Sequence, residues 1–155
     1  TILACINTGN VRGATTVGGI AGSNVNVNNG TVAACLNIGS LNPQATNLGA
    51  IFGSTSDSQN RVIRTSFWLV GSAEHVITEV GVAVGAGTVG MTDTSALDER
   101  ELRNTTPPAD PAGEQPVVNR LNAEMEANYP QWSAFYQYVM DPASTGITWP
   151  MPMKK

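Results

Sequence analysis

Apolar and polar positions repeat along the first part of the chain in a fixed order. The phrase Ala4–Gly9, with sequence ACINTG, returns as Ala34–Gly39, with sequence ACLNIG, and GGIAG at 18–22 returns as GAIFG at 49–53. A third copy begins at Ser66 and runs on into VGVAVG at 80–85. Offsets of about thirty residues are typical of stacked repeat units.

Within each copy, short apolar runs alternate with turn-forming residues. Residues 31–37 and 48–53 are predicted to be strands, residues 11–13 and 41–42 fit a third short strand, and an Asn-rich loop at 24–30 leads to the next copy. Glycines at the corners suggest sharp turns with close backbone approach or positive φ, at Gly9, Gly22, Gly39, Gly53 and Gly71. We predict a mainly β fold, a parallel β-solenoid (β-helix) of about three rungs, each rung being one repeat.

The pattern changes near residue 92. Residues 1–92 are predicted to form the solenoid repeats, and residues 93–155 a small α+β cap packed on the last rung. Thr94 or Ser95 would be the N-cap of a helix over 96–103. A second helix would begin at Pro116 and carry Val117, Leu121 and Met125 on one face.

The tail combines further strands with most of the large aromatic residues. Residues 135–140 and 146–150 are predicted to be extended, and the tail holds all three Tyr and two of the three Trp. Trp132, Tyr136, Tyr138 and Trp149 are therefore candidate ligand-binding residues, able to stack on a sugar or a peptide. The structural alternative is that these rings cover the last rung, because a solenoid needs a terminal cap.

Composition narrows the class of protein. Charged residues make up 13% of the chain and the net charge is −4, which argues against nucleic-acid binding because such binding needs clustered Lys and Arg. No apolar run approaches the roughly 20 residues of a membrane span. The chain begins at Thr1 with neither Met nor a signal sequence, so we expect it to be a fragment of a longer protein.

The two cysteines occupy equivalent repeat positions. In register, Cys5 and Cys35 would lie about 4.8 Å apart on adjacent rungs. They could form a disulfide or a stack of small buried thiols, and the Ser66 at the next equivalent position favours the reduced stack. Zinc needs four ligands, and His75 is the only histidine, so we expect neither a metal nor a cofactor.

Catalytic motifs are missing from the sequence. The lone His75 cannot supply a two-histidine zinc motif, and the Gly-rich stretch at 85–90 lacks the helix and the ribose-binding acid of a dinucleotide site. A β-helical polysaccharide-degrading enzyme would need several acids or bases on one groove, whereas residues 1–92 carry six scattered charges. We therefore predict that the chain is not an enzyme and has no catalytic residues.

The first copy, CINTGNVRG at 5–13 followed by VGGIAG at 17–22, closely resembles the GLUG repeat of bacterial surface proteins. The second and third copies match less well. The tail, with VNRLN at 118–122 and Trp149–Pro150, is similar to the segment that follows such repeats in adhesin-like surface proteins of Bacteroides-type gut bacteria. The resemblance implies an exported cell-surface module with a role in adhesion, and no catalytic residues carry over.

Three functions are therefore open. The first is a cell-surface module for adhesion or structural support, whose partner would be a host or matrix protein, a glycan, or adjacent domains of the same surface protein. The second is a carbohydrate-binding module that uses the tail aromatics, and the third is an inert spacer.

Overall fold

We describe a computed structural model of the chain, for residues 1–24, 30–41, 44–55, 61–71, 82–87, 89–106, 108, 113–140 and 149–155. The described part is mainly β, with twelve strands and three helices. It divides into two compact units, Thr1–Leu97 (unit 1) and Asp98–Lys155 (unit 2). The composition change at residue 92 falls inside a strand of unit 1, β10 (Gly90–Leu97).

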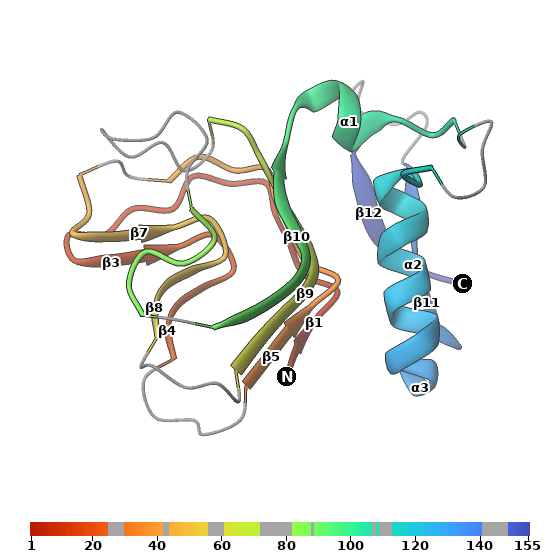
Figure 1. Cartoon of the computed structure of the whole chain (residues 1–155), viewed down its shortest axis with the longest axis horizontal. Coiled ribbons are helices and arrows are strands. Elements are labelled where there is room, and N and C mark those ends of the chain that lie inside the picture. Colours follow the sequence, from red (N-terminus) through yellow and green to blue (C-terminus); the bar gives the residue numbers. More distant parts are fainter. Residues whose placement is uncertain are drawn as a thin grey trace. The chain divides into compact units, whose positions relative to one another are not determined.

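Unit 1 is built from short parallel strands that pair between copies of the repeat. In the main curled sheet, β1 (Ile2–Leu3), β5 (Gly30–Ala33), β9 (Arg61–Leu69) and β10 lie side by side, and β2 (Ile6–Asn7) and β6 (Leu36–Asn37) join the same sheet (Figure 1). Two further pairs of parallel strands each join the first copy to the second. They are β3 (Thr16–Gly18) with β7 (Asn47–Gly49), and β4 (Ala21–Asn24) with β8 (Phe52–Thr55).

The register of these pairs follows the sequence repeat. Ile2 pairs with Val32 and Ile6 with Leu36, thirty residues on, whereas Val17 pairs with Leu48, thirty-one residues on. The third copy follows, since the amide of Ala50 donates to the carbonyl of Val82 at 2.7 Å. The repeated phrases therefore lie directly beside one another.

The predicted strand over 31–37 is interrupted by a left-handed residue. Ala34 has φ 51°, and the equivalent residues of the other copies have φ values of 40° to 53°. The side chain of the residue that follows each of them donates a hydrogen bond to the backbone carbonyl two residues earlier in the chain, at 2.8 to 3.4 Å. These donors are Cys5, Cys35, Ser66 and Thr94. The local bond compensates a backbone conformation that is unfavourable for residues other than glycine.

The predicted helix N-cap at Thr94 or Ser95 is wrong. Thr94 pairs with Ser66, so residues 94–97 belong to β10 and begin a fourth copy of the corner. Helix α1 (Glu99–Arg103) starts after it, with Asp98 as N-cap. The amide of Glu101 donates to Asp98 at 2.7 Å, and the amide of Asp98 donates to the Glu101 carboxylate at 2.8 Å, which forms a capping box.

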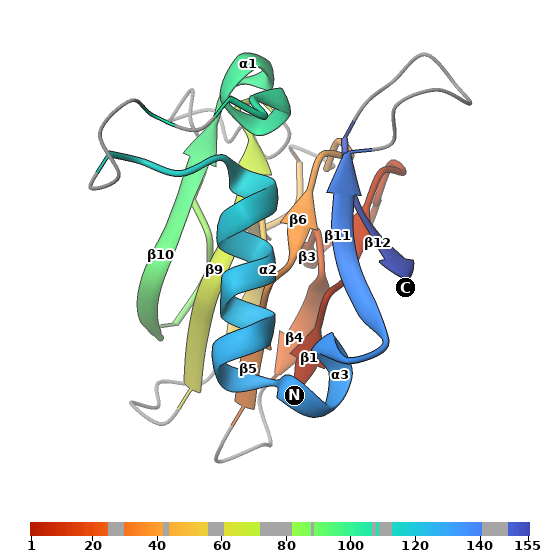
Figure 2. The ribbon, with the colours of Figure 1, turned by 90° about the vertical axis from the view of Figure 1, so that its right-hand side faces the viewer.

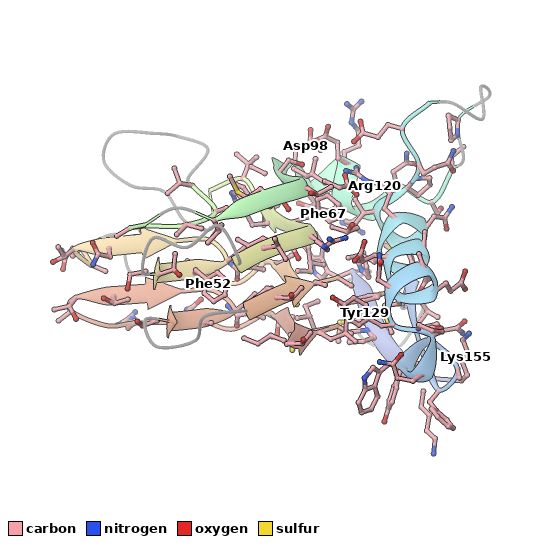
Figure 3. The ribbon with its side chains drawn as sticks, turned by 60° about the horizontal axis from the view of Figure 1, so that its bottom comes forward. Phe52, Phe67, Asp98, Arg120, Tyr129 and Lys155 are labelled. Atoms are coloured by element: carbon pink, nitrogen blue, oxygen red, sulfur yellow. The ribbon has the colours of Figure 1, made fainter. Side chains whose placement is uncertain are left out.

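The core of unit 1 is apolar with one buried amide. Phe52 (Figure 3) and Trp68 are buried in it, together with aliphatic residues of the middle copies. Asn37 is fully buried, and it accepts a 2.8 Å hydrogen bond from Nδ2 of Asn7 in the preceding copy. The two asparagines occupy equivalent positions of adjacent copies. Their contact satisfies a polar group that would be costly to bury alone.

Unit 2 combines helices with a two-stranded antiparallel sheet. Helix α2 (Val117–Asn128) begins one residue later than predicted, and it buries the predicted face of Val117, Leu121 and Met125. It runs beside β11 (Tyr136–Met140), which pairs with β12 (Pro150–Lys154) (Figure 2). A short helix, α3 (Pro130–Ser133), joins α2 to the sheet. The predicted strand over 146–150 lies mostly outside the described residues, and β12 begins where it ends.

Close backbone approach, more than positive φ, explains the corner glycines. Gly71 has φ 85°, as predicted, but Gly39 and Gly53 do not have positive φ. A Cβ on Gly39 would lie 2.0 Å from the carbonyl oxygen of Gly9 in the neighbouring copy. A Cβ on Gly9 would meet no atom nearer than 3.8 Å.

This contrast gives a matched pair of variants. We expect Gly39→Ala to lower the free energy of unfolding by about 2 kcal/mol or more, because the backbone of the stack must shift to admit the methyl group. Gly9→Ala at the equivalent position should change it by less than about 1 kcal/mol. Urea unfolding of both variants measures the difference, and equal effects would contradict the stacked register.

Candidate functional site

The four aromatic residues predicted to bind a ligand lie in different surroundings. Trp132 on α3 is 51% exposed and Tyr136 at the start of β11 is 41% exposed, whereas Tyr138 is 2% exposed. Trp149 is partly buried. Only Trp132 and Tyr136 therefore present a large ring surface to solvent.

Tyr138 belongs to the core of unit 2. The side chain of Asn122 on α2 clamps its backbone, since Nδ2 donates to the Tyr138 carbonyl at 2.8 Å and Oδ1 accepts from the Tyr138 amide at 2.6 Å. These two hydrogen bonds to the backbone of β11 fix helix α2 against the strand. The buried ring leaves no face on which a sugar could stack.

Trp149 is engaged by a side chain of its own unit. The guanidinium carbon of Arg103 lies 5.9 Å from the centroid of the Trp149 ring, within the range of a cation–π interaction. Arg103 also pairs with Glu99 at 2.5 Å. Trp149 thus ties the start of β12 to α1, which is a structural contact.

Sequence reasoning missed Phe135, which is 59% exposed. The amide of Phe135 donates to the Trp132 carbonyl at 2.9 Å in the turn after α3, and Tyr136 follows directly. The spacing of three between Trp132 and Phe135 is typical of a helical turn and could have indicated that they share one side. We call Trp132, Phe135 and Tyr136 the aromatic surface.

Both cysteines are free thiols in equivalent corners of adjacent copies. The backbone amide of Cys5 donates to Sγ of Cys35 at 3.5 Å, and the amide of Cys35 donates to Oγ of Ser66 at 3.2 Å. A side-chain hydrogen bond from Cys35 lowers the pKa of Cys5 to about 6, although burial opposes this shift. The same interaction with Cys5, together with burial, raises the pKa of Cys35 well above its ordinary value. Cys5 is the thiol that can ionise near neutral pH.

A cluster of metal-binding side chains is missing from the described residues. No group of three or more His, Cys, Asp and Glu residues converges there, and His75 lies outside them. A depression of about 830 Å³ is lined by residues 99–101 and 103–106, in and directly after α1. Its lining holds carboxylates, guanidinium groups and hydroxyls, without a thiol or an imidazole.

The comparisons with known proteins give no further assignment. No family model, no curated protein and no solved structure matches this chain. The helices in the described part of the chain are too short or too polar for any of them to cross a membrane.

The thiol pair predicts an unusual pH profile of alkylation. With a pKa of about 6, Cys5 should react with iodoacetamide at a rate that rises through pH 6 and is close to its plateau at pH 7. Cys35, which is fully buried, should stay unmodified in the folded chain. Cys35→Ala removes the hydrogen bond, so the pH at which Cys5 reacts at half its maximal rate should move up toward 9.0. A wild-type midpoint already near 9.0, read by mass spectrometry, would contradict the proposed contact.

Proposed function

We propose that this chain is a non-catalytic module of a bacterial cell surface, serving adhesion or structural support, with the repeats forming a β-solenoid of about three rungs. The observation that carries the proposal is the parallel pairing of successive copies at offsets of thirty or thirty-one residues. Such a stack grows by adding copies, so it suits the projection of a binding surface.

The chemistry of the stack supports a scaffold. Its repeated positions are occupied by small, neutral groups: the Cys5–Cys35–Ser66–Thr94 ladder and the Asn7–Asn37 pair. Each is satisfied by bonds within or between copies. A polysaccharide-degrading site would instead require acids or bases converging on one groove. The resemblance to the GLUG repeat agrees with an exported, extracellular location.

Carbohydrate binding is the second candidate, and the aromatic surface favours it. Trp132, Phe135 and Tyr136 are all more than 40% exposed and adjoin one another through the turn after α3. Exposed rings bury much apolar area at a small entropic cost, which suits recognition of a sugar face or a matrix protein. Of the residues predicted from sequence, Trp132 and Tyr136 remain the binding candidates.

A binding array with matched tryptophan variants tests these functions. We expect the purified chain to bind a glycan or an extracellular-matrix protein, and Trp132→Ala to weaken that binding at least about tenfold, as loss of a central aromatic contact does. Trp149→Ala is the control, because Arg103 already packs on that ring. Circular dichroism must show that both variants fold.

The outcomes separate the candidates. Loss of binding in Trp132→Ala alone supports recognition by the aromatic surface. Binding that survives in both variants contradicts the carbohydrate-binding candidate and leaves the repeat surface as the adhesive part. In the third outcome the chain binds nothing on the array under conditions where the intact surface protein adheres. That result contradicts a role in adhesion and leaves a structural role.

A further inference from the structure

The corners of the repeat place a small hydrogen-bonding side chain at the same point of each copy. The series is Cys5, Cys35, Ser66 and Thr94, and its first two members are thiols. The residues before and after the two thiols pair in one register, at an offset of thirty, as Ile6 does with Leu36. Cys5 and Cys35 are therefore direct neighbours across two parallel copies.

The geometry of the corner brings the two thiols within reach of each other. The backbone amide of Cys5 donates to Cys35 Sγ at 3.5 Å, so this sulfur already faces the first copy. Residues in register on neighbouring parallel strands lie about 4.8 Å apart. The Cα atoms of two disulfide-bonded residues are usually about 4.4 to 6.8 Å apart. A disulfide between Cys5 and Cys35 therefore fits the existing pairing of the copies.

Both thiols make only weak hydrogen bonds that a disulfide would replace. Cys5 Sγ donates to the Leu3 carbonyl at 3.4 Å, and Cys35 Sγ donates to the Ala33 carbonyl at 3.2 Å. Because an S–H group is a weak donor, little is lost when both protons leave. Each thiol also shifts the pKa of the other, downward for Cys5 and upward for Cys35, which agrees with two sulfurs in contact.

We propose that Cys5 and Cys35 form a reversible disulfide that joins the first two copies of the repeat, with a small disulfide such as oxidised glutathione as the oxidant. One protein thiol attacks the small disulfide, which gives a mixed disulfide, and its proton goes to the small thiol that leaves. The second protein thiol then attacks the protein sulfur of the mixed disulfide, and a second small thiol leaves with its proton. In total two protein thiols are oxidised, and one small disulfide is reduced to two thiols.

The disulfide fixes the pairing of the two copies. It closes a covalent loop from residue 5 to residue 35, which restricts the unfolded chain and so stabilises the folded one. Strands β2 to β5 lie inside this loop, and each of them is only two to four residues long. The inference rests on the register of the copies and stands whether or not the chain is adhesive.

The test is refolding of the full chain in buffers with different ratios of oxidised to reduced glutathione. Refolding gives the oxidant access to both thiols before the copies pair. In oxidising buffer we expect a monomer that is two hydrogen atoms lighter, with both cysteines protected from iodoacetamide in urea. An excess of reduced glutathione should restore two thiols that react. The oxidised chain should melt at least about 5 °C higher than the reduced chain.

Two double variants are the matched controls for the register. Cys5→Ser with Ser66→Cys puts the thiols at positions 35 and 66, on adjacent copies, where the amide of Cys35 already donates to Ser66 Oγ at 3.2 Å. This variant should form a disulfide. Cys5→Ser with Thr94→Cys puts the thiols two copies apart, at roughly 10 Å, which is beyond the roughly 7 Å that a disulfide can bridge. This variant should keep both thiols free at equilibrium.

Several results would overturn the proposal. They are two thiols that stay free at every glutathione ratio, a mixed disulfide with glutathione that does not close, a disulfide between two chains, or equal closure in both double variants. An oxidised chain that melts below the reduced chain would also overturn it, because the bond would then distort the paired copies. The wild-type measurements decide the question even if a double variant fails to fold.

Discussion

Unit 1 depends on parallel backbone pairing between copies of the repeat. The strands of the first two copies are two to four residues long, and strands that short are not stable alone. They are held because backbone amides of one copy donate to backbone carbonyls of the neighbouring copy, as in the bonds from Leu36 to Cys5 and from Ile38 to Asn7. A shift of register by one residue would turn buried side chains such as Leu36 to the surface.

The same constraint explains the small and neutral residues of the repeat. Adjacent copies lie so close that glycine is required at Gly39, where a Cβ would collide with the backbone of Gly9. A charged group repeated at one position in every copy would face its own equivalents, and like charges in direct register destabilise a sheet. Thiol, hydroxyl and amide groups can instead bond to the neighbouring copy. The low charge of the repeats thus follows from their pairing in register.

Much of this arrangement could be predicted from the sequence, because repeated phrases report equivalent positions. The buried face of α2 followed from spacing alone. The left-handed corner at Ala34 could not be predicted, since alanine has no preference for that conformation and the compensating bond comes from the next side chain. The fourth corner was hidden because Thr94 resembles a helix N-cap, and only its pairing with Ser66 identifies it as a strand residue. In the candidate site, exposure separated Trp132 and Tyr136 from Tyr138, which depends on tertiary packing against α2.

The most direct test of the account is the pattern of backbone nuclear Overhauser effects in the folded chain. Parallel stacking predicts contacts that join each strand residue of the first copy to a residue thirty or thirty-one positions later, including Ile6 with Leu36 and Val17 with Leu48. The partner number should increase as the residue number increases. Contacts in which the partner number falls as the residue number rises would mean antiparallel hairpins, and they would contradict the parallel pairing of the copies.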